Sequence, residues 1–236
     1  MKIAKIVIPA LAVVAAVTVT VFVITSHSDK PVAKAAPAKQ AAAQQEPARD
    51  APNVLYTTSS EASLQHDFDT IAELNKCDFV DAIVKGTVTA TKDVYEDDYA
   101  MRLLTVDVQK CFKGQTATTI QVYEDGGLVP VKLLLPEMQI HGGGNNLTQE
   151  QIDTGVVDVR FLGAPHSEVG DTVLLYLYNN PNAGHEGTYQ LVSCTHGRFI
   201  LNAKSQNWER VTAPGRPNYQ ASMGKSALEA ELQDLQ

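Results

Sequence analysis

Two kinds of hydrophobic pattern divide the chain. Residues 6–25 (IVIPALAVVAAVTVTVFVIT) form an uncharged run of twenty positions that follows Lys2 and Lys5. Twenty residues of helix rise about 30 Å, which is the thickness of a bilayer core. The run therefore predicts a single membrane-spanning helix, and the two lysines favour an N-terminus on the cytoplasmic side.

A secretory signal peptide is the alternative interpretation of this run. Ser26-His27-Ser28 places small residues where a signal peptidase inspects the chain. The run is longer than the usual core of a signal peptide, so a retained anchor is favoured over secretion. No cysteine precedes Cys77, so the sequence contains no motif for a lipid-anchored N-terminus.

The segment that follows is rich in Ala, Pro, Lys and Gln and has few large apolar residues. Such a composition does not bury enough apolar surface to offset the entropy cost of ordering the chain, so a disordered stalk is expected. We assign residues 1–26 to the anchor or signal peptide, 27–57 to the stalk and 58–236 to one folded domain. The domain is long enough to bury a full hydrophobic core.

The folded domain begins and ends with a helical period. Thr58 and Glu61 fit a capping box for a helix over 59–76, and Ser226 and Glu229 fit a second one near the C-terminus. The last helix would present Leu228, Leu232 and Leu235 on one face.

Between these helices the hydrophobic period changes to two, which is typical of strands. The predicted strands are separated by Gly, Asp, Asn and Pro turn signals. They span 83–91, 103–108, 119–123, 156–162, 172–178, 188–193 and 198–201. Many short strands at this spacing indicate a mainly β (α+β) fold, an antiparallel OB-like or netrin-like barrel with a helix before it and a helix after it.

Five segments within 79–201 strengthen this interpretation. In order they read VDAIVKGTV, LLTVDVQKCFKG, TIQVYEDGG, VGDTVLLYL and TYQLVSCTHGRF. The pattern resembles a family of uncharacterised secreted or membrane-anchored domains of Gram-positive bacteria. Its motifs are turn and core residues, so the resemblance implies the fold and no particular activity. Met138 to Thr154 looks like an insertion relative to that pattern.

The charge distribution excludes one class of partner. The formal net charge is −8, and residues 1–52 carry six basic and three acidic residues, so the remainder has a net charge of −11. Nucleic-acid binding needs clustered Lys and Arg, so a nucleic-acid partner is not expected. The acidic excess favours solubility.

The sharpest enzymatic hypothesis is a sortase-like cysteine transpeptidase. Leu191 to Cys194 partly resembles the sortase Thr-Leu-x-Thr-Cys motif, with His141 as the acid or base and Arg198 or Arg210 as the oxyanion donor. Gln190 and Ser193 replace the two threonines of that motif, and the strand order differs from that of sortases. A non-catalytic role is therefore favoured over this hypothesis.

Other reactive patterns are weaker. Asp153-Thr154-Gly155 matches the aspartic-protease triplet, but such a site needs two carboxylates and only one copy exists. His141, His166, His185 and His196 show no metal-ligand spacing and are expected to be solvated loop residues. No metal site and no cofactor are therefore predicted.

The remaining candidates are structural. Cys77, Cys111 and Cys194 are odd in number, which permits at most one disulfide, and buried free thiols are favoured for at least two of them. The aromatic residues concentrate late in the chain, where a core role is favoured over a ligand platform. They are Tyr176, Tyr178, Tyr189, Phe199 and Trp208.

The sequence thus favours a membrane-anchored or secreted extracytoplasmic protein with a binding or interaction domain at the cell surface. Its partners would be the membrane, through the N-terminal helix, and a protein or another component of the cell envelope. A sortase-like enzyme using Cys194 and a structural cell-envelope spacer are the two alternatives.

Overall fold

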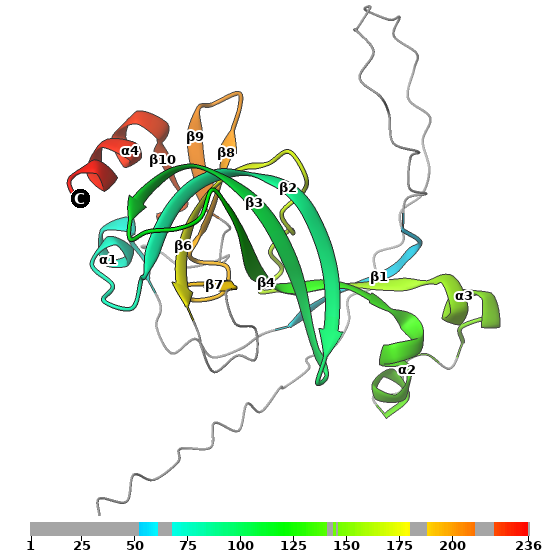
Figure 1. The fold of residues 1–236 in the computed structure, drawn as a ribbon. Coiled ribbons are helices and arrows are strands. Elements are labelled where there is room, and N and C mark those ends of the chain that lie inside the picture. The colour runs from blue at the N-terminus through cyan, green and yellow to red at the C-terminus, as the bar shows by residue number, and fades with distance from the viewer. Residues whose placement is uncertain are drawn as a thin grey trace, which may run out of the picture.

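The computed structural model describes residues 52–60, 68–140, 144, 146–179, 188–210 and 220–235. The fold is mainly β, as the sequence predicts (Figure 1). The strands are β1 (Val54–Ser60), β2 (Ala82–Glu96), β3 (Tyr99–Lys113), β4 (Thr119–Pro130), β5 (Val156–Phe161), β6 (Thr172–Asn179), β7 (Tyr189–Leu191), β8 (Arg198–Asn202), β9 (Asn207–Arg210) and β10 (Ser222–Gly224). The helices are α1 (Ile71–Asn75), α2 (Val131–Ile140), α3 (Gln149–Thr154) and α4 (Lys225–Gln233).

Five strands form a closed circuit of pairings. The long strands β2 and β3 make an antiparallel hairpin, whose turn places Asp97 and Asp98 at positive φ. β4 adds antiparallel to β3, and β6 adds antiparallel to β2. The short β7 then pairs antiparallel with β6 and parallel with β4. The order β2, β3, β4, β7, β6 therefore returns to β2, while β8, β9 and β10 extend the sheet beyond β6.

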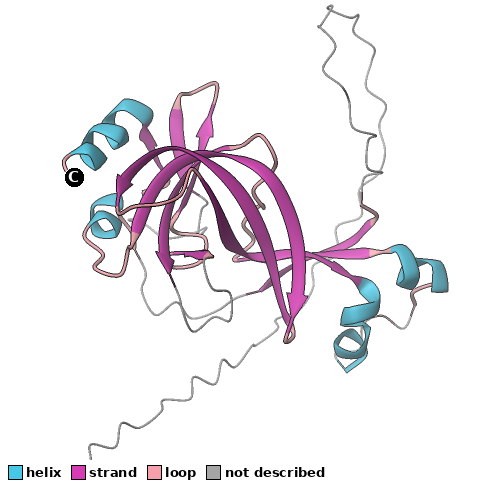
Figure 2. Cartoon of the chain, viewed as in Figure 1, coloured by secondary structure: helices cyan, strands magenta, loops and turns pink. Residues whose placement is uncertain are grey.

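Besides its short pairing with β7, β4 pairs with two other strands along different parts of its length. Its residues 119–125 pair with β3, whereas residues 126–130 pair antiparallel with β5. β5 in turn pairs parallel with β1. We call residues 126–130 together with α2, α3, β5 and β1 the arm, and we call the other described elements the body. Figure 2 shows the arm helices at the opposite end of the molecule from α1 and α4.

The apolar core lies in the body and has two parts. One cluster contains alternate residues of the circuit strands, such as Val84, Leu104 and Leu175. The other contains Leu174, Tyr176 and their neighbours, packed with buried residues of α1 and α4. Successive residues of a strand point to opposite faces, so β6 contributes to both clusters. This explains its uninterrupted apolar sequence, which a strand with one solvated face would not have.

The N-terminal part of the domain corrects one prediction. Residues 54–60 form strand β1, in which Thr58 lies opposite Val159, so a helix does not begin at 59 and the folded part begins before 58. The helix starts instead at Ile71, where Thr70 and Glu73 form the capping box. Strand pairing with β5 outweighs the local capping signal, because Val, Tyr and Thr favour extended structure.

The C-terminal helix is confirmed, but its capping box is not. α4 follows Gly224, which makes no side-chain cap. The Glu229 carboxylate accepts a hydrogen bond from Lys85 Nζ at 2.9 Å instead. Leu228 and Leu232 are buried, whereas Leu235 lies beyond the helix and is exposed.

Two further expectations concern other parts of the chain. The stretch that looks like an insertion includes the end of α2 and the whole of α3, for which Thr148 provides the N-cap. The run 6–25 and most of the stalk lie outside the described residues. Within the described ranges, none of the helices has the length and apolar character needed to cross a membrane.

Candidate functional site

The candidate site lies where the arm joins the body. Gly126 has a φ of +88°, and a Cβ there would lie 2.4 Å from the Val159 carbonyl oxygen and 3.0 Å from Cε1 of His166. Only glycine allows β5 and the His166 ring to approach the β4 backbone this closely. Immediately before this glycine, Glu124 and Asp125 project to opposite faces of the strand. Each carboxylate is the centre of its own polar cluster.

Glu124 is almost fully buried and pairs with an equally buried arginine. Its Oε1 lies 2.5 Å from Nη1 of Arg198, and the backbone N–H of Ser167 lies 3.2 and 3.3 Å from its two oxygens. Arg198 also donates to Ser167 Oγ and to the Pro165 carbonyl. Burial alone would raise the pKa of Glu124, but the charge of Arg198 and the donated hydrogen bonds outweigh it and lower the pKa to about 2.

His166 connects Glu124 to a second carboxylate. Its Nε2 lies 2.9 Å from Oδ1 of Asp158 in β5, and its Nδ1 lies 3.4 Å from Oε1 of Glu124. The second contact is an ion pair that is long for a hydrogen bond. Asp158 also accepts from Nε and Nη2 of Arg160, at 2.9 and 2.7 Å. Burial opposes the imidazolium form of His166, yet the two carboxylates outweigh it and raise its pKa.

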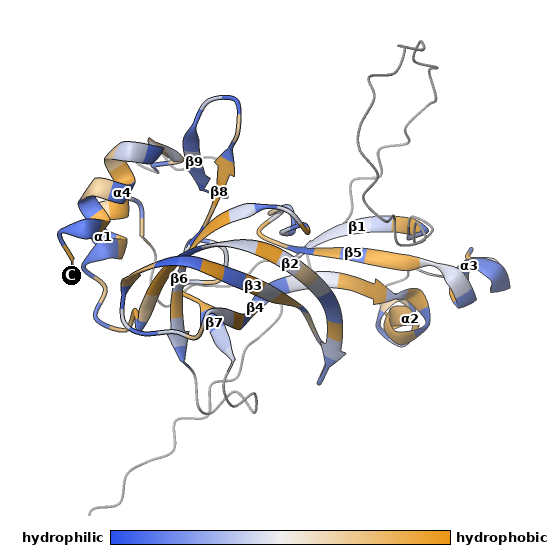
Figure 3. Cartoon of the chain, turned by 45° about the horizontal axis from the view of Figure 1, so that its top comes forward, coloured by the Kyte–Doolittle hydropathy of each residue, from blue (hydrophilic) through white to orange (hydrophobic). Residues whose placement is uncertain are grey.

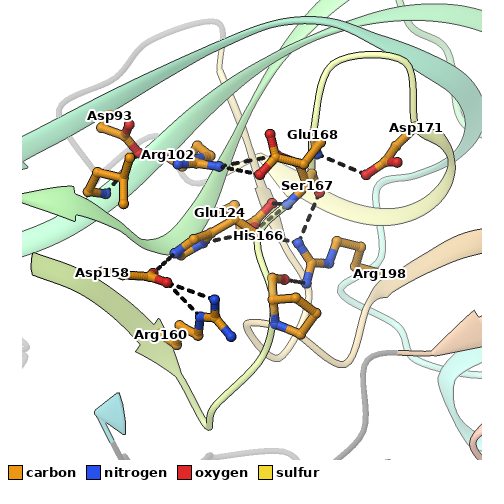
Figure 4. A network of polar contacts seen from close by, with 12 residues as sticks. Asp93, Arg102, Glu124, Asp158, Arg160, His166, Ser167, Glu168, Asp171 and Arg198 are labelled. Atoms are coloured by element: carbon orange, nitrogen blue, oxygen red, sulfur yellow. Dashed lines mark hydrogen bonds and ion pairs between the residues drawn. The ribbon is translucent and has the colours of Figure 1, made fainter. Parts of the chain in front are cut away.

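A third carboxylate holds the arm half of β4. Asp93 in β2 accepts from Nε of Arg102 at 2.8 Å and from the backbone N–H of Leu128 at 3.0 Å. Arg102 is buried and also reaches the Ser167 carbonyl and the Glu168 carboxylate, at 3.3 and 3.5 Å. Figure 4 shows these side chains converging from β2, β3, β4, β5, β8 and the loop before β6. We call this set of residues the junction network.

Asp125 has a separate and uncharged set of partners. Tyr99 donates its hydroxyl hydrogen to Asp125 Oδ1 at 2.5 Å, and the Cys194 thiol is also hydrogen-bonded to this carboxylate. Burial and the neighbouring carboxylate both raise the pKa of Cys194. A thiol with a raised pKa is a poor nucleophile, because the thiolate is the reactive form.

The structure does not bring the sortase-like set together among the residues it describes. His141 lies outside the described residues. Arg198 is buried against Glu124, whereas Cys194 is bonded to Asp125, which faces the other side of β4. The alternative arginine, Arg210, donates from Nε to the carbonyl of His196 at 2.9 Å.

Two of the four histidines correct the expectation of solvated loop residues. His166 is buried in the junction network, and His196 is also buried. Burial, followed by the charge of Arg210, lowers the pKa of His196 to about 4, so that ring is neutral. His141 and His185 lie outside the described residues. In the described ranges, no group of three or more His, Cys, Asp or Glu side chains could hold a metal ion.

The other sequence candidates are placed as follows. Asp153 lies in helix α3 and accepts from Gln149 Nε2 at 3.1 Å, so it does not sit in a strand-end turn of the aspartic-protease kind. Cys77, Cys111 and Cys194 are free thiols; Cys77 is buried and the other two are only partly buried, so the expectation of two buried thiols is wrong. The core role is confirmed for the three fully buried aromatic residues, and the other two are partly buried. The buried three are Tyr176, Phe199 and Trp208.

The sequence did not identify most of the junction network. Glu124, Asp158 and Arg102 are charged residues next to apolar residues in their strands, and that pattern was the available signal. Arg198 was singled out, but as an oxyanion donor. Because each buried charge faces an opposite charge, the network can bind and hold a proton between Glu124 and Asp158, and it presents no unpaired nucleophile.

The sequence comparisons do not add a family assignment. No protein-family model matches the chain, and no curated protein matches it.

Proposed function

We propose that this protein is a non-catalytic binding protein with an OB-like barrel, working on the outer side of a cell membrane. The barrel assignment is supported by the closed circuit, in which the parallel β4–β7 pair joins the two ends of an otherwise antiparallel set. A five-stranded Greek-key barrel of this kind is typical of OB folds, which bind ligands with strand faces and loops. That residues 6–25 anchor the protein in the membrane, or alternatively direct its secretion, is inferred from the sequence alone.

The observation that carries the binding role is the free edge of β1. Among the described residues, β1 pairs only with β5, so its other edge offers backbone donors and acceptors. Its sequence, VLYTTSS, contains no charge, proline or glycine. Natural proteins usually protect an edge strand with such residues, and an unprotected edge is a template for another strand. We therefore infer that an extended, uncharged segment of a partner polypeptide adds to β1 as a new strand.

The rest of the arm exposes apolar side chains that a bound partner would cover. Helix α2 is apolar (VKLLLPEMQI), yet only its first residue, Val131, is buried. Leu133 is 47% exposed and Ile140 is 81% exposed. Figure 3 shows orange residues on α2 and β5, at the end of the molecule away from α1 and α4. An exposed apolar patch at one end of a domain is typical of an interaction surface.

The sortase-like alternative has less support. It requires a reactive Cys194 thiolate, but burial and Asp125 raise the pKa of that thiol. It also requires an arginine that is free to bind an oxyanion, and Arg198 is paired with Glu124. The spacer alternative makes no use of the unprotected edge of β1.

Site-specific photo-crosslinking on intact cells tests the proposal. A photoreactive side chain replaces Thr57, an exposed residue in the middle of β1, and a matched control replaces Glu150, an exposed residue of α3. We expect a discrete protein adduct from position 57 that is weak or missing from position 150. Adding Ser59→Lys should abolish the adduct, because a charge on the edge disfavours strand addition.

Three results would contradict the binding role of the β1 edge. They are equal adducts from both positions, no adduct from position 57, and an adduct that Ser59→Lys leaves unchanged. A loss of thiol-dependent transpeptidation in Cys194→Ala cells would instead support the enzyme.

A further inference from the structure

The junction network crosses the boundary between two parts of the fold. Glu124 belongs to the β4 residues that pair with β3, whereas Asp158 lies in β5 of the arm. Between them, β4 passes through Gly126 and Gly127, where its pairing changes from β3 to β5. His166 follows β5 and contacts both carboxylates. Its imidazole therefore connects the body to the arm at the point where β4 changes partner.

The contacts of the ring determine its protonation state. A carboxylate lies next to each ring nitrogen, and an ionised carboxylate only accepts hydrogen bonds. A neutral imidazole carries one N–H, so one of its nitrogens would present a lone pair to a carboxylate. Nε2 makes a hydrogen bond to Asp158, whereas Nδ1 makes no hydrogen bond and has only a charge contact with Glu124. Only the doubly protonated imidazolium presents a proton rather than a lone pair to both carboxylates. This conclusion rests on the geometry of the contacts.

The surrounding charges hold both carboxylates in the ionised form. The charged groups near the ring lie on β2, β3, β4, β5 and β8 and on the loop that carries His166. The charged groups are Glu124 of β4, Asp158 and Arg160 of β5, Arg102 of β3, Arg198 of β8, Asp93 of β2, and Glu168 and Asp171 of the loop. Arg198 compensates Glu124 and Arg160 compensates Asp158, so His166 is the one member of this group whose charge changes near neutral pH.

We propose that the imidazolium of His166 clamps the arm to the body, and that loss of one ring proton as the pH rises frees Asp158 and β5 from Glu124, while Ser167 keeps its own hydrogen bonds to Glu124. The release would change the position of the arm relative to the body without unfolding the apolar clusters, because neither cluster includes a residue of the arm. The inference does not depend on what binds the arm.

The direction of the pH effect follows from the raised pKa of His166. Its folded-state pKa is raised above its ordinary value of 6.5. The clamp therefore contributes its full stability below about pH 6.5 and loses it as the pH rises through the raised pKa. His196 provides an internal comparison, because its side chain is also buried but its lowered pKa leaves the ring neutral at pH 7.

Hydrogen exchange of the full-length protein in detergent micelles, measured between about pH 6 and about pH 9, tests the clamp. After correction for the intrinsic pH dependence of exchange, peptides over 156–171 should lose protection as the pH rises. Peptides over 103–108 in the body should keep their protection.

His166→Gln should remove this pH dependence, whereas His196→Gln should leave it intact. The clamp is wrong if protection over 156–171 is flat with pH in the unaltered protein, or if His166→Gln keeps the same slope. If His166→Gln does not fold, NMR of the unaltered protein tests the clamp by measuring the protonation state of the two ring nitrogens of His166. Two protonated nitrogens at pH 7 support the clamp, and a neutral ring at that pH overturns it.

Discussion

The body and the arm are stabilised in different ways. The body holds both apolar clusters, which include the fully buried Trp208, Tyr176 and Leu104. The arm buries a few apolar side chains, among them Val129, Val157 and Phe161, but none of them belongs to either cluster. The arm is held by strand pairing and by the junction network instead.

This difference indicates which part of the molecule changes its stability with pH and ionic conditions. Apolar burial contributes about 25 cal/mol for each Å² and hardly depends on pH. A buried ion network depends on every partner, because losing one charge leaves another buried and uncompensated. The body should therefore respond mainly to changes of volume, and the arm mainly to changes of charge and backbone conformation.

The largest expected effect is on the body. Trp208→Ala should destabilise the protein by about 4 kcal/mol, because it removes the largest side chain of the cluster that packs with α1 and α4 and leaves a cavity. Chemical denaturation followed by circular dichroism measures this change. The control on the arm, Leu133→Ala, should change the stability by less than about 0.5 kcal/mol, since that residue is 47% exposed and belongs to neither cluster. Similar losses of stability from both variants would show that the body and the arm do not differ in how they are stabilised.

The next effect is on the junction network. Glu124→Gln should cost about 3 kcal/mol, because it leaves Arg198 buried without its counter-charge. The folded-state pKa of Glu124 is about 2, below its ordinary value of 4.5. Its contribution is therefore present above about pH 4.5 and is lost as the pH falls towards 2.

Denaturation curves measured between about pH 2 and about pH 6 check this acid dependence. The unaltered protein should lose stability with acid more steeply than Glu124→Gln. Parallel curves for the two proteins would show that this carboxylate is not ionised and paired in the folded state.

A smaller effect tests the backbone at the junction. Gly126→Ala should destabilise the arm by about 2 kcal/mol, because the residue has positive φ and its Cβ would meet the Val159 carbonyl. Gly170 also has positive φ, but a Cβ there meets nothing within 4 Å. Gly170→Ala should therefore cost about 1 kcal/mol, and hydrogen exchange of 156–161 should change only in the first variant. Equal hydrogen exchange over 156–161 in the two variants would show that a Cβ at position 126 does not disturb β5.

The smallest effect concerns the other face of β4. Cys194→Ser should change the stability by less than about 1 kcal/mol, because a hydroxyl can also donate to Asp125. In the unaltered protein, Cys194 should react more slowly with iodoacetamide at neutral pH than it does after denaturation. Mass spectrometry of the alkylated peptides measures both rates. A faster reaction in the folded protein would favour the cysteine enzyme.

Several parts of the fold could be read from the sequence because their signals are local. Strand periodicity located seven strands, and the uninterrupted apolar run of 172–178 matches β6, which is buried on both faces. The C-terminal helix was found from the spacing of Leu228 and Leu232, which are buried. These signals survive folding because the side-chain period of an element is set by its own backbone.

Other parts could not be read, because they depend on contacts between distant segments. β1 was taken for stalk and helix, since its pairing with β5 involves residues about a hundred positions away. β9 and β10 were missed; they pair with each other, and β9 also pairs with β8. His166 was expected in solvent because glycine and proline surround it, and only packing against β4 and β5 makes it buried.

The sequence by itself determined the mainly β class and the position of most strands. Tertiary structure decided that the strands divide into a body and an arm, and that Glu124, Asp158, His166 and Arg198 meet at their junction. The reason is physical. Periodicity and turn residues act over a few positions, whereas a buried charge can be placed only after its counter-charges arrive from other strands.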